Sequence, residues 1–109
     1  MITATVPAQG YRFSERCEGI EIGHAFLYVL KNDLHREPFG LLEDLYVHPL
    51  HRGRGIARLL HQAVCEYARE CGCYKLIATS RNDGTRKKVH EWYERLGYRA
   101  YGTEFRMDL

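Results

Sequence analysis

Residues 52–57, Arg-Gly-Arg-Gly-Ile-Ala, have the composition of an anion-binding turn. They follow a strand-like run, residues 41–47, and they open a strongly periodic helix that begins near Ile56. Glycines at this place let backbone N–H groups approach a ligand closely, and the helix start adds positive charge from its dipole. The segment therefore predicts a phosphate or pyrophosphate site. The alternative is a helix-capping loop whose arginines are only solvated.

The elements around this segment follow from the spacing of apolar residues. One apolar stripe recurs at helical spacing and consists of Ile56, Leu59, Leu60, Ala63, Val64, Tyr67, Ala68 and Cys71. Gly72 is a natural end for that helix, and residues 74–79 are typical of a buried strand. Because a strand, a helix and a strand in this order form a crossover, the two flanking strands should be parallel.

The rest of the chain is mostly strand-like. Further strands are predicted over residues 2–5, 11–16, 20–30, 98–101 and 104–109, and a second helix over residues 85–96 with Gly97 as its cap. Glu18 and Gly19 supply a turn, and Gly23 indicates a bulge or a close backbone approach. The early connections are too short for crossover helices, so those strands should be antiparallel. The predicted fold class is α+β, with a mixed, mostly antiparallel sheet, one parallel strand pair and two helices.

Composition narrows the class of protein. The 109 residues, with 45% hydrophobic and 28% charged residues, predict a single domain, residues 1–109, of an ordinary globular protein. A net charge of +2 gives no reason to expect a nucleic-acid partner. The four cysteines form no CxxC pair, so neither a disulfide framework nor a metal site is expected. No apolar run approaches the roughly 20 residues of a membrane span, which leads us to expect a cytoplasmic protein.

Three motifs in chain order resemble the GCN5-related N-acetyltransferase (GNAT) family. The spacing Arg52-x-x-Gly55-x-Ala57 is similar to the family's acetyl-coenzyme A signature. Residues 43–49, Glu-Asp-Leu-Tyr-Val-His-Pro, are similar to its fourth strand, and residues 92–98, Trp-Tyr-Glu-Arg-Leu-Gly-Tyr, to its helix-end motif. Each motif alone would be weak, but the three lie on the element types that the family requires.

This resemblance implies a site for acetyl-coenzyme A and a direct transfer of acetyl to a primary amine in a ternary complex. The residues implied in cofactor binding are Leu45, Tyr46, Val47, Arg52, Gly53, Arg54, Gly55, Ile56, Ala57 and Arg86. The backbone N–H near Val47 would polarise the thioester carbonyl. Tyr93 matches the family's general acid, and Glu43 is the candidate base or acceptor-binding carboxylate. The alternatives are a core aromatic for Tyr93 and a surface carboxylate for Glu43.

The chain departs from the family pattern at Arg86 and in the segment before its second-strand equivalent. Arg86 stands where the family often has Asn, and phosphate contact and solvated helix charge are both open for it. About ten residues precede the second-strand equivalent, where the family usually has a strand and two helices, so the acceptor side should be open or completed in a homodimer.

Besides an N-acetyltransferase, a second hypothesis for the function is a coenzyme A-binding regulatory module with weak or no catalysis. A third, a basic nucleic-acid-binding module, has little support because the net charge is low.

Overall fold

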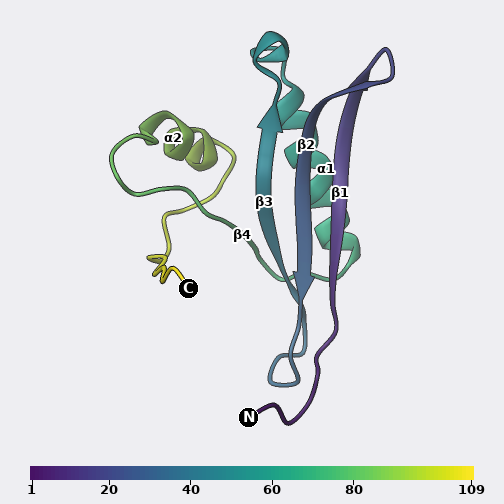
Figure 1. Ribbon diagram of the computed structural model, residues 1–109, viewed down its shortest axis with the longest axis vertical. Helices are drawn as coiled ribbons and strands as arrows, with labels where there is room; N and C mark the ends of the chain where they lie inside the picture. The colour runs from purple at the N-terminus through teal and green to yellow at the C-terminus, as the bar shows by residue number, and fades with distance from the viewer. The chain divides into compact units, whose positions relative to one another are not determined.

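Four strands form one sheet in the order β1-β2-β3-β4 (Figure 1). The strands are β1 (Ala8–Cys17), β2 (Ile20–Leu30), β3 (Phe39–Val47) and β4 (Leu76–Ala78). The first three pair in antiparallel fashion, and β4 runs parallel to β3. This computed structural model describes all 109 residues, which form two compact units, residues 1–78 and 79–109. The mixed sheet and two helices confirm the predicted fold class.

The β1–β2 hairpin is closed by the predicted turn. Glu18 and Gly19 both have positive φ, at 51° and 80°, which is the backbone that a tight hairpin turn between twisted strands requires. β2 has the predicted bounds, whereas β1 extends beyond the predicted residues 11–16 at both ends. Gly23 confirms its prediction, because a Cβ there would lie 3.1 Å from the Tyr46 carbonyl oxygen and 3.2 Å from a Leu60 methyl group.

Helix α1 (Ile56–Glu70) lies against one face of the sheet and closes the core (Figure 1). The buried apolar residues are Ile22, Ala25, Leu27, Leu42, Val47, Ile56, Leu60, Val64 and Ala68. Two positions differ from the predicted stripe: Leu59 is 57% exposed, and His61 is buried in its place. A straight helix with 3.6 residues per turn drifts relative to its sheet, so an i, i+3 position can leave the contact zone. The sequence of α1 nevertheless predicts its start and its end at Gly72, where φ is 82°.

The crossover through α1 brings β4 beside β3, but only for three residue pairs. β4 pairs Leu76, Ile77 and Ala78 with residues 40–42 of β3 and ends there, so it is shorter than the predicted strand over residues 74–79. Gly40 lets the strands meet, because a Cβ there would come within 2.9 Å of a Leu76 methyl group. Within residues 1–78, the carboxyl half of β3 therefore has no strand neighbour on the β4 side.

The second unit contains helix α2 (Lys87–Arg95), which is shorter than the predicted helix over residues 85–96. A turn precedes it, in which Asp83 accepts hydrogen bonds from the backbone and side chain of Thr85. Gly97 follows the helix with φ of 102°, as its predicted role as a cap requires. Neither helix of the protein is long and apolar enough to cross a membrane.

Three predicted strands were wrong. Residues 2–5, 98–101 and 104–109 form no strand. Alternation of apolar and polar residues favours a strand only where a neighbouring strand supplies backbone partners. Residues 1–7 precede the paired part of β1, and the side chains of the last segment are exposed, with Phe105 at 92%. There, Arg106 and Asp108 pair with each other at 2.8 Å.

Candidate functional site

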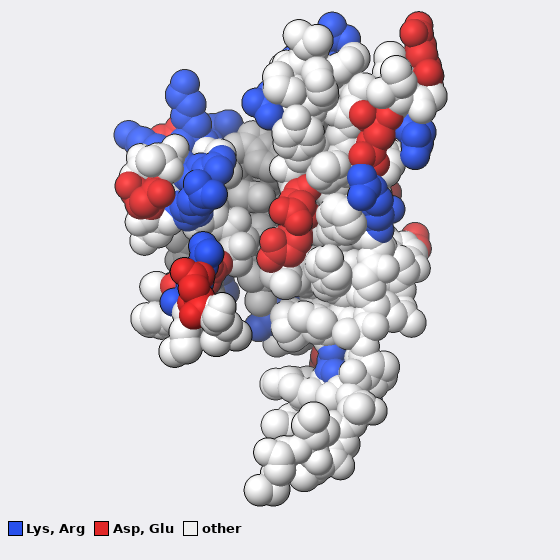
Figure 2. Space-filling view, viewed as in Figure 1, with Lys and Arg blue, Asp and Glu red and all other residues white.

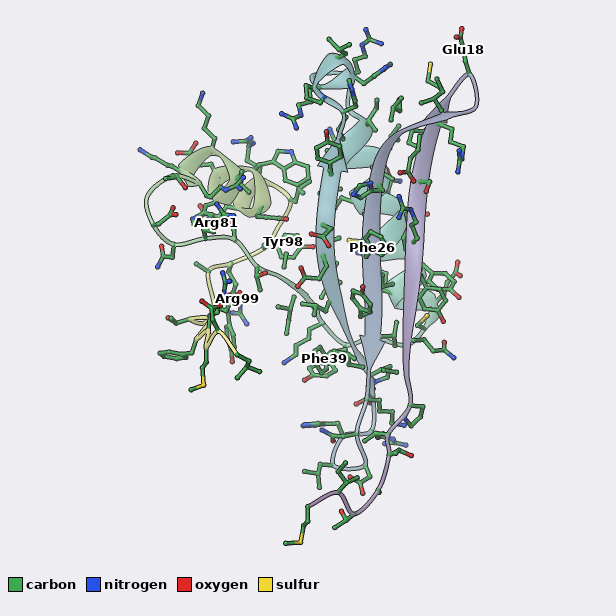
Figure 3. All side chains as sticks on the ribbon, in the orientation of Figure 1. Glu18, Phe26, Phe39, Arg81, Tyr98 and Arg99 are labelled. Carbon is green, nitrogen blue, oxygen red and sulfur yellow. The ribbon has the colours of Figure 1, made fainter.

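A bulge near the end of β3 sets the orientation of the predicted site residues on that strand. Phe26 pairs with Glu43 and His24 with Tyr46, so two steps along β2 correspond to three steps along β3. Asp44, inside the bulge, has φ of 50°. Side chains in a regular strand alternate between faces, so residues three apart would point to opposite faces. The bulge instead places Glu43 and Tyr46 on one face, the face opposite α1, together with Phe26 and His24. Figure 3 labels Phe26 on this face.

The backbone of Val47 points to the edge that β4 leaves open. The N–H of His48 donates to the Ile22 carbonyl of β2 at 2.7 Å. Successive N–H groups of a strand point to opposite edges, so the N–H of Val47 is directed away from β2. The carbonyl of Val47 lies on the same side and accepts a hydrogen bond from Arg52 Nε at 2.8 Å. Arg52 thus ties the strand end to the following loop, and its guanidinium lies 5.6 Å from the centre of the Tyr46 ring.

The loop from His48 to Gly55 delivers the chain into α1 with its first backbone donors available. A short helix, η1 (Pro49–His51), follows His48, whose Nδ1 accepts from the Leu50 N–H at 3.2 Å. Gly53 and Gly55 then adopt left-handed backbone, with φ of 78° and 80°. A Cβ at either glycine would meet nothing within 4 Å, so the backbone conformation, and not crowding, requires glycine here.

The start of α1 is suited to an anion. The helix has no side-chain cap and no acidic residue in its first turn. Its first internal hydrogen bond runs from the Leu59 N–H to the Gly55 carbonyl at 3.1 Å, so the preceding N–H groups, those of Ile56, Ala57 and Arg58, have no partner within the helix. The exposed side chain of Arg54 adds positive charge beside them. This open cradle of glycines and backbone donors fits a pyrophosphate group.

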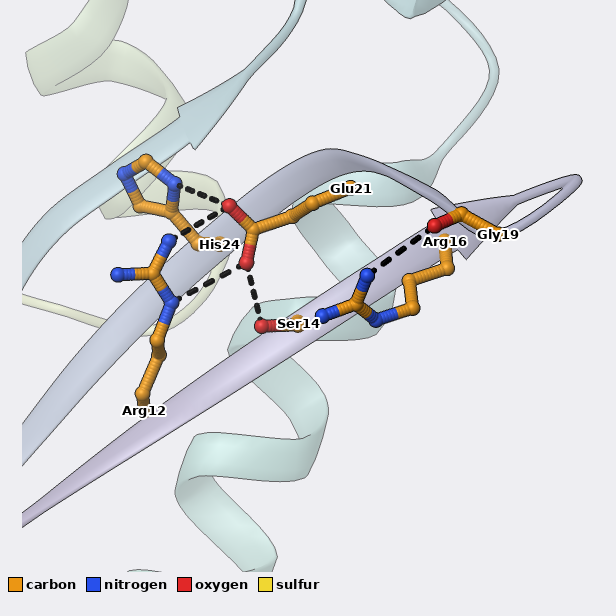
Figure 4. Close-up of polar contacts among 6 residues, drawn as sticks. All are labelled: Arg12, Ser14, Arg16, Gly19, Glu21 and His24. Atoms are coloured by element: carbon orange, nitrogen blue, oxygen red, sulfur yellow. Dashed lines mark hydrogen bonds and ion pairs between the residues drawn. The ribbon is translucent and has the colours of Figure 1, made fainter.

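A cluster of polar side chains lies on the face of the sheet opposite α1, which we call the open face (Figure 4). The sequence analysis did not predict this cluster. The carboxylate of Glu21 accepts hydrogen bonds from Arg12 Nε at 3.1 Å, Arg12 Nη2 at 2.6 Å and Ser14 Oγ at 2.5 Å. It also lies 3.4 Å from Nδ1 of His24. The hydrogen bonds from Arg12 and then from Ser14 lower the pKa of Glu21 to about 2. The available signal was two polar residues, Glu21 and His24, inside an otherwise apolar strand.

Aromatic rings connect this cluster to the end of β3. The His24 ring lies 5.7 Å from Phe26 and 5.4 Å from Tyr46, measured between centroids. Arg12 lies over Phe26 at 5.1 Å. Figure 2 shows this face of the sheet, on which acidic and basic side chains lie among uncharged ones. The open face therefore combines aromatic surface with charged groups.

The two remaining predicted site residues, Tyr93 and Arg86, belong to the second unit. Tyr93 is half-buried on α2; its ring lies 5.1 Å from Tyr98 and 5.4 Å from Trp92. The Tyr98 N–H donates to the Tyr93 carbonyl at 3.0 Å, which ties the chain after the helix back to its last turn. Arg86 is the exposed N-cap residue of α2, and its carbonyl accepts from the His90 N–H at 2.9 Å.

Residues 11–98 match the Acetyltransferase (GNAT) family. A glucosamine 6-phosphate N-acetyltransferase from Trypanosoma brucei brucei is 40% identical over 70 residues, which are 64% of this chain and 44% of that protein. An aminoglycoside N(6')-acetyltransferase type 1 from Stenotrophomonas maltophilia is 34% identical over 85 residues, which are 72% of this chain and 51% of that protein. The chain thus spans about half the length of the curated relatives it matches.

A solved structure agrees with these sequence relationships. The crystal structure of a Trypanosoma brucei acetyltransferase has a TM-score of 0.78 and 32% identity, and the match covers 94% of this chain and 69% of that one. The family match extends over most of the chain and includes the predicted cofactor loop, the end of β3 and Tyr93. The chain therefore belongs to the GNAT acetyltransferase family.

Proposed function

We propose that this protein transfers acetyl from acetyl-coenzyme A to a primary amine by direct attack within a ternary complex. The observation that carries this proposal is the combination of an uncapped helix start with an open strand edge immediately before it. The first fits the pyrophosphate of coenzyme A, and the second offers backbone groups for its pantetheine arm. Both belong to one continuous segment, residues 43–57.

On the donor side, the N–H groups at the start of α1 and the side chains of Arg52 and Arg54 bind the pyrophosphate. Backbone groups of Leu45 and Val47 pair with the pantetheine along the edge that β4 leaves open, whereas those of Tyr46 point toward β2. Acetyl-coenzyme A supplies an activated acetyl group as a thioester. The Val47 N–H donates to the carbonyl oxygen of that group, where negative charge develops.

On the acceptor side, Glu43 contacts the amine, either as its base or as the carboxylate that binds its charge. An attacking amine must be neutral, so a proton acceptor near the open face is required. Tyr93 donates a proton to the departing thiolate; a phenol with a pKa near 10 can protonate a thiolate whose thiol has a pKa of about 8.5. Arg86 contributes positive charge toward the cofactor.

The acceptor class is supported by the two relatives, because one is named for glucosamine 6-phosphate and the other for aminoglycosides. Both substrates contain an amino sugar, and the aromatic and charged side chains of the open face suit a polar ring that carries an ammonium group. We therefore propose an amino sugar as the first acceptor to test. A second copy of the chain in a homodimer would extend this open side.

Release of free thiol from acetyl-coenzyme A tests this function. The purified protein is assayed with amino sugars, polyamines, amino acids and an N-terminal peptide, each matched with its N-acetylated form as a control. The proposal expects amine-dependent thiol release with at least one free amine and none with the acetylated controls. Binding of coenzyme A without thiol release for any amine would instead support the alternative, a regulatory coenzyme A-binding module.

A further inference from the structure

A second bulge, in the β1–β2 ladder, creates a carboxylate–imidazole pair beside the proposed acceptor position. Glu15 pairs with Gly23 but Arg16 pairs with Glu21, so one residue of β2 is extra. Glu21 and His24, three residues apart, therefore lie on the same face of the sheet. This is the same device that places Glu43 and Tyr46 together on β3. The two bulges bring both pairs onto the face opposite α1.

The pair is held in a defined geometry. Glu21 is fixed by the two Arg12 contacts and by Ser14, and its carboxylate lies 3.4 Å from His24 Nδ1. A carboxylate at Nδ1 selects the tautomer and the orientation of an imidazole. The other ring nitrogen of His24 is turned away from Glu21 (Figure 4). An ion pair between Arg12 and Glu21 would not by itself require a histidine at this position.

His24 lies one strand away from the residues proposed to hold the acetyl group and the amine. Its strand partner is Tyr46, the residue before Val47, and its diagonal neighbour across the strands is Glu43, which pairs with Phe26. Diagonal neighbours are about 7–8 Å apart at their backbones, within reach of long side chains or one water. His24 is thus on the open face, half-exposed, one strand away from the proposed acyl position.

We propose that His24, oriented by Glu21, accepts the proton that the acceptor's ammonium group must lose before it attacks. The proposal rests on the proposed function. The ammonium N–H bond breaks and the proton goes to Nε2 of neutral His24. The freed lone pair forms the new C–N bond while the C–S bond breaks. The departing sulfur takes a proton from the Tyr93 hydroxyl. The nitrogen then gives its second proton to the Tyr93 phenolate, which restores the phenol.

In this scheme Glu43 binds the ammonium charge, His24 is a catalytic residue, and Glu21 is a positioning residue that acts through His24. The charged and titratable groups around His24 are Glu21 on its own strand, Tyr46 and Glu43 on β3, and Arg12 on β1. Arg52 lies over the ring of Tyr46. Only a neutral imidazole can accept a proton, so activity should fall at low pH.

The test is the pH profile of kcat/KM for the acceptor amine, measured on the full chain for wild type, His24→Gln, His24→Ala and Glu21→Gln. We expect His24→Gln to lower kcat by about 10²-fold and to remove the acid limb assigned to His24. Added imidazole should restore part of the activity of His24→Ala. Glu21→Gln should lower kcat and leave KM for the amine near wild type, because Glu21 acts only through the orientation of His24.

The matched control is His35→Gln, an exposed histidine in the loop between β2 and β3, which should leave activity and profile unchanged. Coenzyme A affinity and thermal melting of each variant check folding. An unchanged acid limb in His24→Gln, wild-type kcat in Glu21→Gln, or no rescue by imidazole in a folded His24→Ala, would overturn the assignment. If wild type transfers acetyl to no amine, the proposed function itself fails; if it transfers acetyl independently of His24, only this inference fails.

Discussion

The donor loop and the open sheet face are built by different means. The donor loop, residues 52–57, consists of backbone donors at a helix start and two left-handed glycines. The open face consists of side chains, which two bulges and three paired strands bring together from distant parts of the sequence. The loop is therefore a local feature, whereas the face exists only once β1, β2 and β3 pair in the correct register.

Because the two regions are built differently, they tolerate different substitutions. A backbone site depends on φ values and on the length of the loop, and changes of exposed side chains affect it little. A side-chain site depends on individual functional groups, and a single substitution can remove its chemistry while cofactor binding persists. Variants in the donor loop should therefore change binding of coenzyme A, whereas variants on the open face should change turnover.

The largest expected effect is on turnover, from Tyr93→Phe. Loss of the proton donor to the thiolate should lower kcat by about 10²-fold or more, since general acid catalysis contributes at least that much. Affinity for coenzyme A, measured by calorimetry, should stay near wild type. Tyr101→Phe, at an exposed tyrosine of the same unit, is the control and should change neither quantity. Wild-type turnover in Tyr93→Phe would remove this residue from the mechanism.

The next effect is on binding, from Gly55→Val. A β-branched residue at φ of 80° is strained by about 1–2 kcal/mol or more, so the loop should change conformation and lose about tenfold in coenzyme A affinity. Gly19→Val is a close match, because Gly19 also has φ of 80° and open space around it, but lies in the β1–β2 turn.

The two glycine variants should lose comparable stability, while only Gly55→Val weakens coenzyme A binding. Equal affinities in both would contradict the assignment of the donor loop. Thermal melting and calorimetry on the same samples provide both readouts.

A smaller effect is expected from Arg54→Gln. An exposed charge at a helix start contributes about 0.3–1 kcal/mol to binding an anion, so affinity for coenzyme A should fall about two- to fivefold at low salt. The difference from wild type should shrink as ionic strength rises. Arg36→Gln, at an exposed arginine of the β2–β3 loop, should show no such difference, and an effect there equal to that of Arg54→Gln would argue against a local role.

The smallest effect concerns stability at low pH. The pKa of Glu21 is lowered from 4.5 to about 2 by Arg12 and Ser14, so its contribution to stability is present above pH 4.5 and is lost as pH falls toward 2. The melting temperature of wild type should therefore decrease over this window more than that of Glu21→Gln. Parallel curves for the two proteins would show that the cluster does not stabilise the open face.

The sequence predicts the local features well and the paired ones poorly. The bounds of α1 and β2 and the left-handed glycines follow from periodicity and from residue type, both of which are local. The alignment of Glu21 with His24 does not, because a three-residue spacing indicates opposite faces unless a bulge intervenes. The predicted strands at the two ends failed for a related reason: alternation over residues 2–5 or 104–109 does not supply a neighbouring strand.

Single turnovers with acetyl-coenzyme A and an amino sugar, in which free thiol and N-acetylated product are measured together, test the proposed acetyl transfer. Direct transfer predicts equal amounts of the two products, formed only when the acceptor has a free amine. It also predicts that Tyr93→Phe slows both equally while coenzyme A affinity is retained. Tight coenzyme A binding with neither product formed, for amino sugars and every other amine tested, would contradict it.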